Sequence, residues 1–233
     1  MNGMQLPLAV HLPQTAAFDS FVTGADNHEV VQALQSGQSA YLFGAAGTGK
    51  THLLMAAARA HGGTYLPWSA VAAAGLDVLE GYSHPQHLAI DEVDLAGAAD
   101  DSWQAMLRLL DQRHQHQRVT WCAALKPPEH LPGLAADLRT RLAQFPRYGL
   151  HTLDEAGQRT LLLEGARRRG LKLPDEVVRW WLHHLPRDPA RVLDTLDQLD
   201  RAALREQRRV TLPFVQAVLA ARAAETGQTA RSR

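Results

Sequence analysis

The chain has 233 residues, 45% of them hydrophobic, which is enough to bury the core of one α/β domain and of a small second domain. Its 24 basic and 24 acidic side chains balance, so the net charge alone does not require a nucleic-acid partner. The single cysteine, Cys122, excludes a disulfide framework, and no pair among the 12 histidines has a spacing that favours a metal site of the protein's own.

The two parts of the chain differ in charge. Residues 1–150 hold 9 of the basic and 13 of the acidic side chains, whereas residues 151–233 hold 15 and 11. This asymmetry is compatible with a polyanionic or acidic neighbour for the C-terminal part, or simply with a solvated face. No stretch resembles a signal peptide or reaches 18 apolar residues, so we expect a soluble, cytoplasmic protein.

Residues 1–17 carry several apolar side chains on a segment whose prolines favour an extended backbone. The apolar groups are concentrated in the stretch Gln5-Leu6-Pro7-Leu8-Ala9-Val10. Such a tail either docks onto the protein's own body or binds a groove on a partner. The composition of the tail leaves both alternatives open.

Residues 44–51, with the sequence GAAGTGKT, match the P-loop pattern G-x-x-x-x-G-K-[ST] at every fixed position. An apolar strand is predicted before them at 40–43, and a helix after them at 51–59. Glycines in this context let backbone N–H groups converge on an anion, while a lysine neutralises the β- and γ-phosphates and a hydroxyl binds Mg²⁺. The predicted nucleotide-binding residues are Gly44, Gly47, Thr48, Gly49, Lys50 and Thr51.

Asp91 and Glu92 follow the apolar stretch 87–90, which we predict to be a strand. In a parallel sheet, ligands bind beyond the carboxyl ends of the strands, so Asp91 is placed to share the Mg²⁺ of Thr51. Glu92 beside it is a candidate for polarising an attacking water. The alternative is that both are ordinary surface acids at the end of a strand.

Further strands are expected at 64–66, 119–125 and 148–153, with helices at 101–116 and 134–142 between them. Strands that alternate with helices indicate a parallel sheet with right-handed crossovers. From residue 154 on, the pattern is helical, with Asp188-Pro189 as one clear start signal. We therefore predict a five-stranded α/β domain with helices on both faces at 18–153, a helical lid domain at 154–225 and a disordered tail at 226–233.

Together these features resemble the P-loop AAA+ superfamily, and within it the DnaA replication-initiator family with its regulatory Hda branch. Residues 18–27, FDSFVTGADN, are similar to the segment that precedes the P-loop in DnaA-like proteins. Residues 137–142, DLRTRL, are similar to the arginine-finger helix of that family, and residues 187–191, RDPAR, open the helix that carries its sensor II residue. The resemblance covers nearly the whole chain.

The resemblance implies roles for particular residues. Arg141 would be an arginine finger acting in trans, with Arg139 as the next candidate, and Arg191 would contact a phosphate. A cation in the first turn of a helix opposes the helix dipole, so Arg191 needs a nearby anion, which the neighbouring Asp188 could also supply. Leu125 departs from the family, because it stands where a polar sensor I residue is usual.

The resemblance also implies partners. Gln5, Leu6, Leu8 and Val10 are similar to the short tail by which the Hda branch binds the sliding clamp of DNA polymerase III. That branch works with ADP (or ATP) and Mg²⁺ on DNA-loaded clamps, where it stimulates hydrolysis of the ATP bound to DnaA and so inhibits initiation. DNA would be contacted through the clamp complex, and a homodimer is compatible with the resemblance.

Two other functions remain compatible with a short AAA+ chain. One is a helicase loader of the DnaC type, and the other is a self-contained ATP-driven ATPase. Neither needs a clamp-binding tail, so the stretch from Gln5 to Val10 favours the regulator. Glu92 leaves some intrinsic ATPase activity open, whereas Leu125 argues for little.

Overall fold

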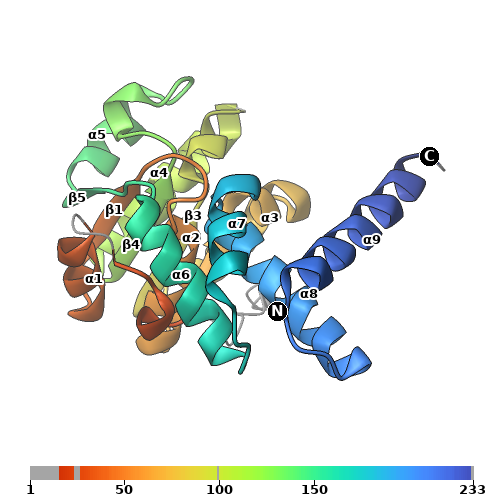
Figure 1. Cartoon of the computed structure of the whole chain (residues 1–233). Coiled ribbons are helices and arrows are strands. Elements are labelled where there is room, and N and C mark those ends of the chain that lie inside the picture. The colour runs from red at the N-terminus through yellow and green to blue at the C-terminus, as the bar shows by residue number, and fades with distance from the viewer. Residues whose placement is uncertain (1–15, 24–26, 99, 232–233) are drawn as a thin grey trace. The chain divides into compact units, whose positions relative to one another are not determined.

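The computed structural model describes residues 16–23, 27–98 and 100–231 (Figure 1). The predicted clamp-binding residues Gln5, Leu6, Leu8 and Val10 lie outside this part of the chain. The chain divides into two compact units, one up to Thr152 and one from Leu153 on. Within the described residues, no helix combines the length and the apolar character needed to cross a membrane.

The first unit is built on a five-stranded sheet in which every neighbouring pair is parallel, in the order β2-β3-β4-β1-β5. The predicted α/β class is therefore confirmed. The strands are β1 (Ala40–Phe43), β2 (Thr64–Pro67), β3 (His87–Asp91), β4 (Val119–Ala124) and β5 (Arg147–Gly149). The last strand is shorter than the predicted 148–153, because after Leu150 donates its N–H to the Phe43 carbonyl the pairing with β1 ends.

Helices cover both faces of the sheet, and the alternation of side chains along the strands shows why. Tyr41 and Cys122 pack toward one face and Leu42 and Trp121 toward the other, all fully buried. Burial raises the pKa of the Cys122 thiol to about 12, so this cysteine is a structural group. The first face is covered by α3 (Trp68–Ala74), α4 (Asp100–Gln115) and α5 (Ala136–Ala143), the second by α1 (His28–Gln35) and α2 (Lys50–Ala60).

A fully buried arginine stabilises the first face at the amino ends of the strands. Arg113 of α4 donates to the Thr120 hydroxyl at 2.9 Å and to the carbonyls of Tyr82 at 2.8 Å, Pro85 at 3.0 Å and Val119 at 2.6 Å. Desolvation lowers the pKa of Arg113 to about 10. Its guanidinium thus connects the end of α4 to β4 and to the segment before β3.

The second unit contains the helices α6 (Glu155–Arg168), α7 (Asp175–His184), α8 (Pro189–Glu206) and α9 (Leu212–Arg231). The start signal at Asp188-Pro189 operates as expected, since the Asp188 carboxylate accepts the Ala190 N–H at 2.9 Å. Leu162, Val178 and Leu196 are among its buried residues. Contrary to the expected tail at 226–233, α9 continues to Arg231, because the alanine-rich sequence after residue 216 lets an established helix propagate.

Candidate nucleotide-binding site

The P-loop connects β1 to α2, and two glycines permit its shape. Gly49 caps α2 with a φ of 93°, and a Cβ there would lie 2.6 Å from Cε2 of Phe21. A Cβ at Gly44 would lie 2.4 Å from the Leu150 carbonyl oxygen. The backbone can therefore close around a small anion, and the first-turn N–H groups of α2, which lack intrahelical acceptors, provide its donors.

The Lys50 ammonium lies over this loop. Its Nζ donates to the carbonyls of Gly44 at 2.7 Å and Ala45 at 2.8 Å, and the residue is only 8% exposed. Burial lowers the pKa of Lys50, while the charges of Asp91 and Asp94 partly oppose that shift. Thr48 also bonds to the Ala45 carbonyl through its hydroxyl, at 3.0 Å. The loop thus holds its cation with its own backbone, next to the start of α2.

Asp91, the last residue of β3, contacts Thr51 at the carboxyl end of the strand. The Thr51 hydroxyl donates to Asp91 Oδ2 at 2.6 Å, and the Glu92 N–H donates to Oδ1 at 2.8 Å. A hydroxyl and a carboxylate brought together in this way are hard oxygen ligands, the kind that Mg²⁺ prefers. These two residues therefore fit the predicted role of holding a Mg²⁺ that accompanies a phosphate.

Tyr65 is a member of this cluster that the sequence reasoning missed. Its hydroxyl donates to Asp91 Oδ2 at 3.0 Å, and burial together with the Asp91 charge raises the pKa of the phenol. The sequence did offer one indication of this role, a tyrosine within an apolar strand, because a buried phenol hydroxyl needs a hydrogen-bond acceptor. β2 pairs with β3, and this pairing determines which acceptor it finds.

Glu92 has an unusual backbone conformation for a residue with a side chain. Its φ is 59°, in the left-handed region. Its carboxylate Oε2 accepts the backbone N–H of Ser69, in the first turn of α3, at 3.0 Å. In this arrangement the carboxylate is engaged at α3 and not directed to a free position beside the P-loop.

The end of β4 carries no polar side chain of its own, as the sequence indicated. Leu125 directly after it is 49% exposed, and its N–H donates to Oδ1 of Asp94 at 3.2 Å. Asp94 comes from the turn after β3, and the sequence reasoning did not single it out. The Asp94 carboxylate therefore lies beside the Leu125 backbone, while the side chain at the predicted sensor I position is apolar.

Arg141 of α5 lies near the amino ends of β1 and β4. Together with Ser39, which precedes β1, and Thr120 of β4, it lines a cavity of about 140 Å³. Its guanidinium forms an ion pair with Asp111 at 2.5 Å and donates to the Gln144 side chain at 2.9 Å. Arg139, two residues earlier, donates to the Leu134 carbonyl at 3.0 Å. The structure therefore does not bring Arg141 to the P-loop of its own chain.

Arg191 belongs to the second unit, in the first turn of α8. Within that unit it lines a cavity of about 370 Å³ with Trp181, Thr195 and Leu219. The Asp188 carboxylate, considered as an alternative partner for Arg191, caps α8. The phosphate contact predicted for Arg191 stays a prediction.

Comparison with known proteins agrees with this arrangement. A family model described as the Hda lid domain matches residues 154–219. Domain III of the DnaA replication initiator from Thermotoga maritima has a TM-score of 0.79 at 18% identity, with 90% of this chain and 98% of that chain covered.

Two further solved structures share the fold. A DnaA bound to AMPPCP and single-stranded DNA has a TM-score of 0.71 at 20% identity, covering 85% of this chain and 70% of that one. A RuvB variant from Thermotoga maritima has a TM-score of 0.67 at 14% identity, covering 90% and 72%. The first unit thus has a P-loop and a five-stranded parallel sheet, the chain shares the fold of DnaA domain III, and residues 154–219 match the Hda lid domain.

Proposed function

We propose that this protein binds an adenine nucleotide with Mg²⁺ and negatively regulates replication initiation by stimulating hydrolysis of the ATP bound to a partner DnaA. The observation that carries the nucleotide part is the 2.6 Å hydrogen bond between Thr51 and Asp91, which brings a hydroxyl and a carboxylate together beside the P-loop lysine. Similar DnaA structures are bound to AMPPCP, which favours adenine as the base.

The nucleotide would be held by the loop itself. The backbone N–H groups between Gly44 and Lys50 would bind the phosphates, Lys50 would exchange its two carbonyl acceptors for phosphate oxygens, and Thr51 and Asp91 would bind the Mg²⁺. The bound Mg²⁺ would neutralise phosphate charge. ADP is the ligand that fits a regulator, because a resting nucleotide need not be hydrolysed.

Two features favour weak ATPase activity of the chain itself. The carboxylate of Glu92 is engaged by the Ser69 N–H, and a base that positions a water must first leave that donor. The side chain of Leu125, directly after β4, is apolar and offers no hydrogen bond to a phosphate. A self-contained ATPase or a helicase loader with its own ATPase cycle would need both positions to contribute.

Arg141 suits action on a second protein. Its side chain is 25% exposed and that of its partner Asp111 is 38% exposed, so the pair lies close to the surface. Surface ion pairs are worth about 0–1 kcal/mol, so exchanging Asp111 for a phosphate costs little. A planar guanidinium that reaches a transferring phosphoryl group is worth about 10³ to 10⁵ in rate.

In this proposal the N-terminal segment brings the protein to the place where it acts. Gln5, Leu6, Leu8 and Val10 would bind the sliding clamp, with the leucines in an apolar groove and the Gln5 amide making directional hydrogen bonds. The clamp would bring the protein to DNA and to DnaA. Deleting residues 1–10 should abolish clamp binding and leave the melting temperature unchanged.

The decisive experiment measures ATP hydrolysis by DnaA in the presence of clamp-loaded DNA and this protein. Arg141→Ala should reduce the stimulated rate by about 10³-fold and leave ADP binding and the melting temperature intact. Arg147→Ala, which removes an exposed ion pair with Glu129, is the matched control and should stimulate normally. Full stimulation by Arg141→Ala would overturn the assignment, and Arg139 would be tested next.

A further inference from the structure

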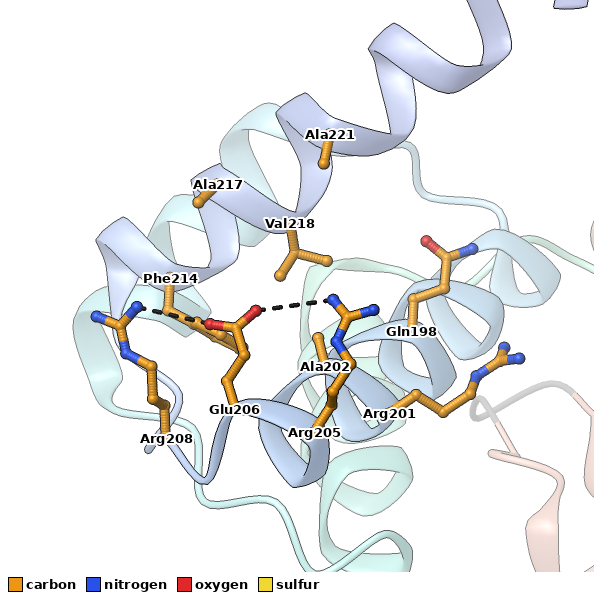
Figure 2. A pocket seen from close by; sticks show the side chains of 10 residues that line it. All are labelled: Gln198, Arg201, Ala202, Arg205, Glu206, Arg208, Phe214, Ala217, Val218 and Ala221. Carbon is orange, nitrogen blue, oxygen red and sulfur yellow. Dashed lines mark ion pairs between the residues drawn. The ribbon is translucent and has the colours of Figure 1, made fainter.

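A wedge-shaped groove lies between α8 and α9 of the second unit. It has a volume of about 730 Å³ and is lined by the facing sides of the two helices and by Arg208 in the connection between them. Figure 2 shows that the helices are close together near Phe214 and Glu206 and diverge toward Gln198 and Ala221. We call this hollow the lid groove. It is formed entirely by residues of the second unit.

Each wall of the lid groove is a single face of one helix. The α8 wall uses positions i, i+3, i+4 and i+7 counted from Gln198, and the α9 wall uses the same positions counted from Phe214. Such a pair of parallel side-chain rows forms two ridges with a furrow between them, into which the ridge of a third helix packs. The span of about two turns on each wall suits a short helical segment.

The floor of the lid groove is aliphatic. Ala217, Val218 and Ala221 present small apolar side chains from α9, so the backbone of a visiting helix can approach closely (Figure 2). Within the lining of the groove the one aromatic ring is that of Phe214, and it is only 3% exposed. Single-stranded nucleic acid gains most of its non-electrostatic binding energy from stacking on exposed aromatic rings, and the lining of the groove has none.

The rim of the lid groove is basic. It carries Arg201, Arg205 and Arg208 against one carboxylate, that of Glu206, which leaves an excess of two positive charges (Figure 2). The Glu206 ion pairs are long, at 3.8 Å to Arg205 and 3.6 Å to Arg208, and the two arginine side chains are 79% and 65% exposed. Ion pairs of this kind contribute little, so the arginines are able to change partners.

We propose that the lid groove is a docking site for an amphipathic helix of a partner protein, with an aliphatic stripe against Val218 and acidic side chains beside Arg201 and Arg205. This is a binding surface in addition to the proposed action of Arg141. The aliphatic floor selects a protein segment over a nucleic acid, and the excess positive charge selects acidic flanks.

The proposal is tested with three synthetic peptides, each about 15 residues long and held helical by a side-chain bridge. One carries leucines at i, i+3, i+4 and i+7 with glutamates on both flanks, a second replaces the glutamates with lysines, and a third replaces the leucines with serines. Binding to the full-length protein is measured by fluorescence anisotropy. The first peptide should bind at least about tenfold more tightly than either of the others.

In the protein variant Arg201→Glu/Arg205→Glu, the affinity for the glutamate peptide should fall at least about tenfold, and the variant should prefer the lysine peptide. Arg167→Glu on α6, an exposed arginine of the same unit, is the matched control and should change neither affinity. Circular dichroism melting checks that each variant is folded.

Two outcomes would overturn the proposal. One is an affinity for the glutamate peptide that the double charge reversal leaves unchanged. The other is tight binding of an oligothymidine strand that depends on Arg201 and Arg205, since the groove would then be a nucleic-acid site.

Discussion

The interior of the first unit and the lid groove of the second unit use charged side chains in opposite ways. In the first unit Asp91, Lys50 and Arg113 are 4%, 8% and 0% exposed, and each has partners at 3.0 Å or less. In the second unit Arg205 and Arg208 have side chains that are 79% and 65% exposed, and their ion pairs are 3.6–3.8 Å long. The sequence shows the same residue types in both units, so the difference is one of environment.

In the first case folding itself supplies the hydrogen-bonding partners of the charged groups. In the second case a bound partner protein would supply them. A buried polar group left without its partner costs about 1–3 kcal/mol, so the arrangement around Asp91 is formed with the fold itself. An exposed ion pair is worth about 0–1 kcal/mol, so Arg205 and Arg208 can turn to another carboxylate at little cost to the fold. The following substitutions test this contrast, beginning with the largest expected effect.

Replacing Arg113 should have the largest effect on stability. Arg113→Met removes four hydrogen bonds and leaves the carbonyls of Tyr82, Pro85 and Val119 without this donor. We expect a loss of at least about 3 kcal/mol in the free energy of unfolding, measured by urea denaturation. Arg108→Met, at an exposed position of the same helix, should change it by less than about 0.5 kcal/mol. Equal effects at the two positions would contradict the role assigned to Arg113.

Replacing Lys50 should affect binding more than folding. In Lys50→Ala the phosphates lose a buried ammonium, and we expect the affinity for Mg²⁺-ADP to fall about 100-fold, or by ~2.7 kcal/mol, in isothermal titration calorimetry. Arg59→Ala, at the exposed end of the same helix, is the control and should bind ADP normally. Unchanged affinity in Lys50→Ala would show that the loop is not the phosphate site.

A smaller effect is expected at His87, whose ring stacks on Trp121 at 5.5 Å. Burial lowers the pKa of His87, and the charges of His61 and Arg113 add to the shift. A histidine with a lower pKa in the folded state binds fewer protons there than in the unfolded chain, so its stabilisation is complete above about pH 6.5 and decreases as the pH falls toward the folded pKa.

Because the His87 ring is partly exposed, its pH-dependent contribution to the free energy of unfolding should be less than about 1 kcal/mol. His87→Gln should remove this contribution. The free energies of unfolding measured by urea denaturation at about pH 7 and about pH 5 should then differ less for the variant than for the parent protein. His116→Gln, at an exposed position, serves as the control. A pH dependence that is the same in His87→Gln and the parent would contradict the assignment.

The smallest effect on stability is expected in the lid groove. Arg201→Glu/Arg205→Glu alters only exposed side chains, so the free energy of unfolding should change by less than about 0.5 kcal/mol, even where peptide binding is lost. A loss comparable to that of Arg113→Met would show that these arginines serve the fold, and the contrast between the two units would fail.

The sequence by itself determined the class of the fold and predicted the centre of a nucleotide site. The P-loop pattern requires glycines, a lysine and a hydroxyl at set positions along one turn, and Asp91 ends an apolar strand, so local spacing was sufficient to find them. The alternation of strands and helices indicated a parallel sheet for the same reason. The prediction that the last helix ends at residue 225 was wrong, because a polar composition does not stop a helix that alanines propagate.

Contacts between distant segments were decided only by the tertiary structure. Tyr65 meets Asp91 because β2 pairs with β3, Asp94 meets Leu125 because β3 pairs with β4, and Asp111 meets Arg141 because α4 and α5 cover the same face. The lid groove likewise depends on the angle between two helices. The order of strands in a sheet and the packing of helices come from burying apolar area over the whole chain, and such a sum has no signature in any single stretch of residues.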